Sequence, residues 1–407
     1  MTNEIPPSAS FNTLSVPDWK ADNERSPEIR QRYEWLEENF PGVADRIFII
    51  TTGEGETPQS VFKAEEDRLE DLGLKEADEK QLKETFVEQV KTLHDTPAAM
   101  PYGMTRHYAD GNSFGVIHLP VNGWATRPEL LDPVSTALFP ADKQDWRNMF
   151  KVYVADQESI HVVDGLTNRS TYADDTGNFS ATGSVKFEAV GEMFSVLSLM
   201  QRAQKGEFSG PVDPFLDRIK LWQQGTLFRH DTAGGHSMVD EAIDMARQWG
   251  RDNGGRLKDM TPQEMLETAR LLTNSLPLPS EKELDGLRRR TSRYLPWGEG
   301  ALGLSHLPSA TEAEVLDNIS HAADSPWERR QFKQAVEAVK TLHDPSHPRM
   351  PDQCWPEGEG ISKKPVGLTP TSALQEEKDM VGEIQVPFRK GQMVPAVPCT
   401  SKPGMKP

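Results

Sequence analysis

The first periodic stretch of the chain, residues 26–42, has the hydrophobic pattern of an amphipathic helix. Ile29, Tyr33 and Leu36 recur at three- and four-residue steps and therefore share one face. Ser26 stands where a hydroxyl can cap a helix, and Pro27 suits the first turn. The pattern predicts a helix that packs one side against a core.

Two stretches further on have the patterns of strands. Residues 46–51 contain a run of bulky apolar side chains that leaves no polar face, which predicts a buried strand. Residues 105–119 contain the turn pair Asp110-Gly111 between two candidate strands, which predicts a β-hairpin.

The stretch that follows the hairpin also predicts strands. Val152 and Val154 alternate with other residues, and Ile160 and Val162 repeat the alternation. With the hairpin, these residues predict a strand-rich middle that extends over about 104–165.

From about residue 184 the hydrophobic period changes to that of helices. Apolar side chains recur at three- and four-residue steps between Phe187 and Leu197. A hydroxyl residue followed three positions later by glutamate, the signature of a helix capping box, occurs at 261–264, 311–314 and 325–328. These segments predict helix starts.

The order of these elements favours the α+β class over a doubly wound sheet, because strand and helix do not alternate regularly. Residues 1–25 are polar and predict a flexible leader. A mixed α/β region, 26–183, and a helical region, 184–343, are predicted to form one compact body. Residues 344–407 are rich in proline, which costs about 3 kcal/mol inside a helix, and predict a largely irregular tail.

Charge and composition exclude several classes of protein. With 45 Lys and Arg against 63 Asp and Glu, the net charge of −18 repels phosphate backbones, so no nucleic-acid partner is expected. No run reaches the ~18 apolar residues of a membrane span, and the first residues lack the pattern of a Sec signal. A cytoplasmic location is the default expectation, with export by a non-Sec route as the alternative. Both cysteines, Cys354 and Cys399, fall in the tail, which excludes a disulfide framework in the body.

The densest group of ionisable side chains begins at residue 229. His230 is the candidate acid or base, and Asp231 could orient it or ligate a metal. Arg229 could clamp a phosphate or carboxylate, because its planar guanidinium matches either group. The sequence names no metal and no cofactor.

The residues that follow are candidates for substrate binding. Gly234 and Gly235 allow a sharp turn before a helix predicted to begin near Ser237. His236 lies between this turn and the helix. Backbone N–H groups at such a helix start can bind an anion. The alternative is a helix capped by Ser237 after a glycine turn, with no ligand.

Two further groups of acids have both a functional and a structural interpretation. Glu188 and Glu192 are one helical turn apart and could act as a carboxylate pair, or they form the solvated face of the helix. Asp174 and Asp175 could hold Mg²⁺ or Mn²⁺, or they belong to an ordinary polar turn.

A short repeat occurs twice in the chain. Residues 87–95 and 336–344 are nearly identical, and the copies end in His94-Asp95 and His343-Asp344. These pairs could be catalytic dyads. The sequence favours a structural role, because a histidine is stabilised near a helix C-terminus.

These observations lead to two functional hypotheses. The first is a hydrolase or transferase that acts on an anionic small molecule bearing phosphate or carboxylate. The alternative is a non-enzymatic interaction protein, such as a bacterial effector exported by a non-Sec route, whose acidic surface meets a basic protein partner.

Overall fold

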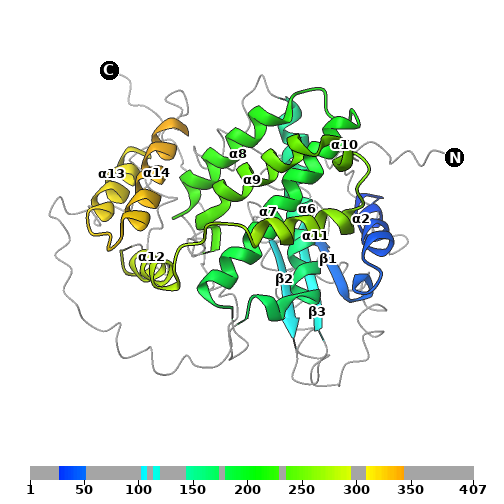
Figure 1. Ribbon diagram of the computed structural model, residues 1–407, viewed down its shortest axis with the longest axis horizontal. Helices are drawn as coiled ribbons and strands as arrows, with labels where there is room; N and C mark the ends of the chain where they lie inside the picture. Colours follow the sequence, from blue (N-terminus) through cyan, green and yellow to red (C-terminus); the bar gives the residue numbers. More distant parts are fainter. Residues whose placement is uncertain are drawn as a thin grey trace, which may run out of the picture.

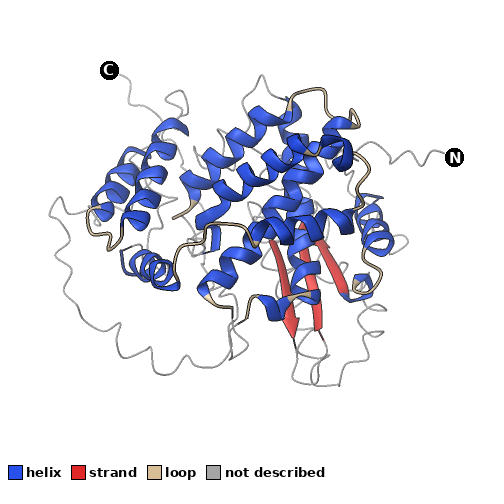
Figure 2. Ribbon diagram, in the orientation of Figure 1, coloured by secondary structure: helices blue, strands red, loops and turns tan. Residues whose placement is uncertain are grey.

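The computed structural model describes residues 27–51, 102–107, 113–119, 144–173, 179–228, 235–294 and 309–342, and it has an α+β fold (Figures 1 and 2). Helices dominate, with one small sheet. The elements in chain order are α2 Pro27–Asn39, η2 Ala44–Arg46, β1 Ile47–Thr51, β2 Tyr102–His107, β3 Ser113–Leu119, α6 Gln144–Thr167, η4 Arg169–Thr171, α7 Ala181–Gln204, α8 Val212–Thr226, η5 Gly235–Met238, α9 Val239–Asp252, α10 Gly254–Leu257, α11 Pro262–Thr273, α12 Glu281–Tyr294, α13 Ser309–Ser320 and α14 Pro326–Leu342.

The sheet has three strands in the order β1-β3-β2. The central strand β3 pairs antiparallel with β2, as the hairpin pattern predicts, and parallel with β1. Ile47, Phe48 and Ile49 of β1 are fully buried, which confirms the buried strand predicted from the apolar run. The pairing of β1 with β3 joins segments far apart in the sequence and was not predicted.

The strands predicted around Val152 and Ile160 are wrong, because these residues lie in the 24-residue helix α6. Most of α6 from Met149 to Gly165 is buried on every side, and this stretch includes buried polar residues such as Ser159 and His161. A helix enclosed on all sides has apolar residues at both odd and even spacings, and short alternating stretches then resemble a strand. Strands in the predicted strand-rich middle are therefore limited to β2 and β3 within the residues described.

Close contact between α6 and the sheet depends on glycine. A Cβ atom on Gly115 of β3 would lie 2.0 Å from Val162 Cγ1, and one on Gly103 of β2 would lie 2.6 Å from the Glu158 carbonyl oxygen. Both distances are far below van der Waals contact, so any side chain there would force the helix away. The absent side chains let α6 lie directly on the strands.

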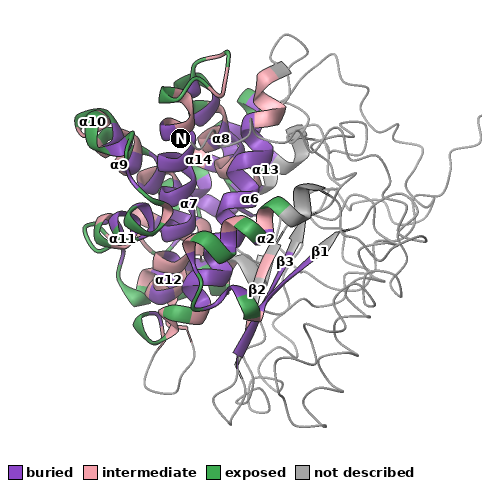
Figure 3. Ribbon diagram, turned by 90° about the vertical axis from the view of Figure 1, so that its right-hand side faces the viewer, coloured by how far each residue is buried: buried purple, intermediate pink, exposed green. Residues whose placement is uncertain are grey.

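The centre of the helical layer is α7, which packs against α6, α9 and α11. Its buried residues run from Gly183 to Gln201, and Figure 3 shows buried ribbon on α7 and its neighbours. The main hydrophobic core joins side chains from α2, the sheet and these helices, including Leu36, Phe194 and Phe215.

A second core lies where α12, α13 and α14 meet the end of α8. Phe228 stacks on Phe332 with ring centroids 4.4 Å apart, and Leu287 and Leu316 are fully buried beside them. The helical character predicted after residue 184 is confirmed.

The predicted capping boxes have different outcomes. The box at Thr261 and Glu264 is complete at the start of α11. At α14, Ser325 Oγ accepts from the Glu328 amide at 3.0 Å, but the Glu328 carboxylate accepts from the Asp324 amide instead. The segment 311–314 does not start a helix, because α13 begins earlier, at Ser309.

Other predictions about organisation are not tested. The leader, 1–25, and the tail, 344–407, lie outside the described residues, and the division of 26–343 into two regions stays a prediction. Among the described helices, none has the combination of length and apolar composition that crossing a membrane requires.

Candidate functional site

The candidate site predicted at 229–237 is described only from Gly235 onward. Arg229, His230, Asp231 and Gly234 lie outside the described residues. Gly235, His236 and Ser237 form η5, which leads into α9. Ser237 is buried and does not cap the helix: the N-cap position of α9 is Met238, which makes no side-chain cap bond.

The short helix η5 packs against α7 at Glu188. A Cβ atom on Gly235 would lie 3.0 Å from Glu188 Cγ, so the glycine permits a close approach. The neighbouring His236 places its Nε2 atom 3.5 Å from Glu188 Oε2.

A second histidine reaches the same carboxylate oxygen from the opposite element. His161 on α6 places Nε2 3.1 Å from Glu188 Oε2. Its ring lies 4.8 Å from the Phe187 ring and packs on Gly191, where a Cβ atom would come within 2.6 Å of the imidazole. We call His161, Glu188 and His236 the His-Glu-His cluster.

Electrostatics in the cluster favour charged His161 and Glu188. Burial alone would lower the pKa of His161, but the charges of Glu188, Glu158 and Asp164 outweigh it and raise the pKa to about 9. Burial alone would raise the pKa of Glu188, but His236 and His161 lower it to about 2. An imidazolium and a carboxylate therefore face each other at neutral pH.

Each imidazole keeps one nitrogen without a partner. The Nδ1 atoms of His161 and His236 are buried and accept or donate no hydrogen bond in the described part of the chain. A buried polar atom without a partner costs about 1–3 kcal/mol, so each Nδ1 is an unsatisfied group inside the packed cluster.

Two acids of α6 flank the cluster in different ways. Burial raises the pKa of Glu158 to about 7, against the attraction of His161 and with the added repulsion of Glu188. Asp164 is fully paired: it accepts from the Tyr172 hydroxyl and, at 2.8 Å, from Arg270 Nε. Asp164 therefore has a structural role, whereas the carboxyl group of Glu158 can gain or lose a proton near neutral pH.

Glu192, one turn after Glu188, is wholly buried, so it does not belong to a solvated face. Gln157 and Gln223 donate to its Oε1 at 2.8 and 3.0 Å, while Oε2 has no partner. Burial, then the charge of Asp240, raises the pKa of Glu192 well above its usual value. The two glutamates have pKa values moved in opposite directions, as in acid–base pairs.

The chain shows no assembled metal site in the ranges described. No group of three His, Cys, Asp or Glu side chains there is placed to hold a metal ion. Asp174 and Asp175 lie outside these ranges. Nearby, Ser180 caps α7 by accepting from the Gly183 amide at 2.8 Å, which is a structural role.

Sequence reasoning named His236 and Gly235 but missed His161 and Glu158. Both missed residues lie in α6, which the sequence pattern assigned to strands. A usable signal was present, because His161 and Asp164 interrupt an otherwise apolar stretch, and buried polar groups need partners. The copies of the short repeat end at residues outside the described ranges, so their His-Asp pairs remain untested.

The pH dependence of stability should reflect these groups. A folded-state pKa raised from 4.5 to about 7 for Glu158 means stability is lost as pH rises through that interval. The raised pKa of His161 extends the loss from 6.5 to about 9, whereas the lowered pKa of Glu188 costs stability only below 4.5. We expect the highest melting temperature near pH 5 and a decline toward pH 9.

The variant Glu158→Gln should flatten the decline between pH 5 and 7 by on the order of 2 kcal/mol. Glu267→Gln, an exposed control, should leave the profile unchanged. Thermal melts at half-unit pH steps measure both. A profile that rises from pH 5 to 8 in the unaltered protein would contradict the assignment.

No protein-family model, curated protein or solved structure matches this chain. What the chain does is therefore inferred from the side chains of the cluster.

Proposed function

We propose that this protein is a hydrolase or transferase that acts on an anionic substrate, with proton transfer carried by the His-Glu-His cluster. The observation that supports this proposal most is the shared carboxylate. One oxygen of Glu188 lies 3.1 Å from one imidazole and 3.5 Å from the other, and both Nδ1 atoms lack partners.

A carboxylate against one ring nitrogen prepares an imidazole for acid–base work. It holds the proton on Nε2, so that Nδ1 of a neutral ring carries the free lone pair and can accept a proton. When the ring is charged, Nδ1 becomes a donor that can protonate a leaving group.

The two histidines differ in exposure and so in proposed role. The side chain of His236 is 21% exposed, whereas that of His161 is 6% exposed and packs on Phe187. We assign proton exchange with substrate to His236 and assign His161 to holding Glu188 ionised. His161 is then a positioning residue.

An anionic substrate suits the charge of the cluster. The charged His161 offsets the Glu188 carboxylate, so an anion that approaches His236 does not meet a net negative charge from this pair. The sequence also places Arg229 and His230 within seven residues of His236.

Replacing His236 tests the proposal. The variant His236→Gln should lower kcat at least about 100-fold, the usual contribution of a general acid or base, with the melting temperature nearly unchanged. Turnover is followed with para-nitrophenyl phosphate for phosphoryl transfer and with the para-nitrophenyl ester of succinate for acyl transfer.

His321→Gln is the matched control, since His321 is exposed just after α13. It should keep full turnover and the unchanged melting temperature. Equal turnover by the His236 variant, or no turnover of either ester by the unaltered protein, would count against the proposal.

The second candidate is a non-enzymatic interaction protein. The observation that favours it lies elsewhere, on α14, where basic side chains that form no ion pair with a described residue line a groove. That surface is independent of the cluster, because the two share no residue.

A further inference from the structure

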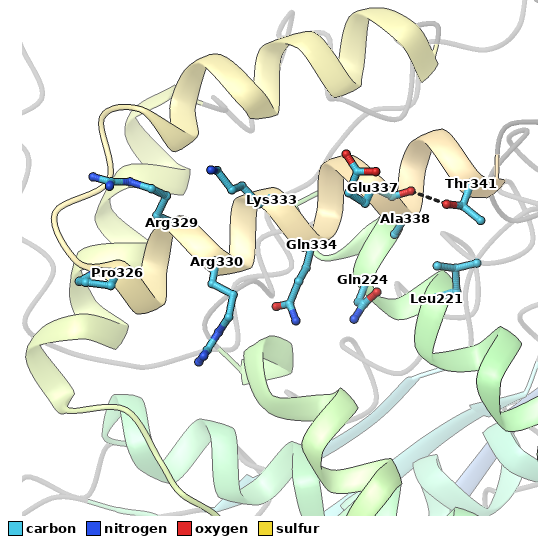
Figure 4. Close-up of a pocket in the computed structure, with 10 residues that line it drawn as sticks. All are labelled: Leu221, Gln224, Pro326, Arg329, Arg330, Lys333, Gln334, Glu337, Ala338 and Thr341. Carbon is cyan, nitrogen blue, oxygen red and sulfur yellow. Dashed lines mark hydrogen bonds between the residues drawn. The ribbon is translucent and has the colours of Figure 1, made fainter.

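A groove of about 490 Å³ lies between α8 and α14 (Figure 4). Its walls include Leu221 and Gln224 of α8 and Arg329, Arg330, Lys333 and Gln334 of α14. In the close-up, Arg330 and Gln334 point from α14 toward the side on which Gln224 lies. The buried face of α14, with Phe332 and Val336, packs into the second core. The groove is therefore lined by a different face of the same helix.

No carboxylate among the described residues neutralises the cations of the groove. Within the described ranges, Arg330 and Lys333 form no ion pair, and Arg329 donates only to the Ala323 carbonyl, at 3.5 Å. The acid of this face, Glu337, is already paired with Lys340 at 3.2 Å.

Several arginines elsewhere in the fold are neutralised by carboxylates. Arg202 pairs with Glu207, Arg270 with Asp164 and Arg290 with Glu328. In a chain of net charge −18, carboxylates are abundant, so a set of uncompensated cations on one helix face is a local reversal of the surface charge.

The position of these cations on α14 strengthens the positive potential. Arg329 and Arg330 lie in the first two turns of the 17-residue helix, near the end where the helix dipole is positive. Basic residues there do not stabilise the helix. They do favour an anion at this end of the groove.

The groove is elongated and its chemistry changes along its length. From Pro326 to Thr341 the helix rises about 22 Å at 1.5 Å per residue, which an extended peptide covers with about seven residues. Amide side chains occupy the middle, and Leu221 and Ala338 contribute apolar surface. Small-molecule pockets enclose most of their ligand, whereas this groove is open along its length, so it suits a peptide better.

We propose that the groove between α8 and α14 binds an extended acidic peptide segment of a partner protein. Acidic side chains pair with Arg329, Arg330 and Lys333, and the peptide backbone meets the amide of Gln334, since the Gln224 amide already donates to Asp240. The acidic end of the peptide lies toward Pro326.

Fluorescence anisotropy with the full chain tests this proposal. The probe is a fluorescein-labelled peptide of about seven residues, acidic in its first half and apolar in its second, with a basic peptide of the same length for comparison. The acidic peptide should bind and should weaken as salt rises from low to physiological strength, while the basic peptide should not bind.

The double variant Arg330→Gln/Lys333→Gln should weaken binding at least about tenfold, an effect of the size that partly desolvated charge pairs produce. Lys340→Gln on the same helix is the matched control and should bind within about twofold, because Lys340 is already paired. Thermal melts of each variant confirm that the fold is retained.

Several outcomes would overturn the proposal. These are no binding of the acidic peptide, equal binding by the double variant, or displacement of the peptide by equimolar inorganic phosphate, which would assign the groove to small anions. His236→Gln should bind the peptide normally, so failure here and failure of the proposed enzyme are distinguishable.

Discussion

Replacing Glu188 with glutamine should lower the free energy of unfolding by about 3–5 kcal/mol at pH 7. The substitution keeps the shape of the side chain but leaves the buried imidazolium of His161 without its carboxylate. The pKa of His161 should fall, because burial, which favours the neutral ring, then dominates. Chemical denaturation measures the stability, and an NMR titration of the His161 ring measures its pKa.

The control for this experiment is Glu337→Gln. Glu337 is 73% exposed and makes one ion pair, with Lys340, so its loss should cost at most about 0.5 kcal/mol. If Glu188→Gln proves as stable as the control, the carboxylate does not hold the cluster together, and the proposed acid–base arrangement loses its basis.

Adding one methyl group at Gly115 should destabilise the fold by about 3 kcal/mol. The new Cβ atom would lie 2.0 Å from Val162 Cγ1. This clash can be relieved only if the strand β3 or the helix α6 is displaced, because the side chain of Val162 is branched and stiff. Chemical denaturation of Gly115→Ala gives the magnitude.

A second-site change makes the cause testable. In Gly115→Ala/Val162→Ala the nearest helix atom is the Cβ of residue 162, at 3.3 Å, so most of the clash is removed. The double variant should be more stable than the sum of the single effects by at least about 1 kcal/mol. Gly286→Ala is the control: it has open space around it in α12, and alanine should leave stability unchanged or improve it. Additive losses in the double variant would show that Gly115 matters for another reason.

The strands that could be predicted were those whose signal is local. A run of large apolar side chains predicted β1, and the turn pair Asp110-Gly111 predicted the boundary between β2 and β3. The complete cap of α11 at Thr261 was equally local, because both of its hydrogen bonds lie within four residues.

The helix α6 could not be predicted from its period. Helices are recognised when one face is polar, and α6 has neighbours on nearly every side. Val152 and Val154 are both buried, although they lie about 200° apart around a helix of 3.6 residues per turn. Only tertiary packing distinguishes this helix from a strand.

The candidate site was partly predicted for the same reason. His236 and Gly235 were found because they lie in a dense polar segment. The contact of His236 with Glu188 joins residues 48 positions apart, which no local spacing in the sequence can show. His161 was hidden inside the misassigned helix. The sequence does show a histidine among apolar neighbours. A search for single polar residues within apolar stretches would find it.

The packing of His161 on Gly191 gives the cluster a signature by which distant relatives can be recognised. A side chain at position 191 would occupy the space of the imidazole, so a homologue that retains the cluster has to retain glycine there. A side chain at position 235 would press less severely on Glu188, at 3.0 Å from its Cγ atom. Glu188-x-x-Gly191, preceded by Glu158-x-x-His161 and followed by Gly235-His236, is therefore a pattern in which glycines and ionisable residues should vary together. A homologue that keeps the glycines but lacks the histidines would have retained the fold without the proposed acid–base chemistry.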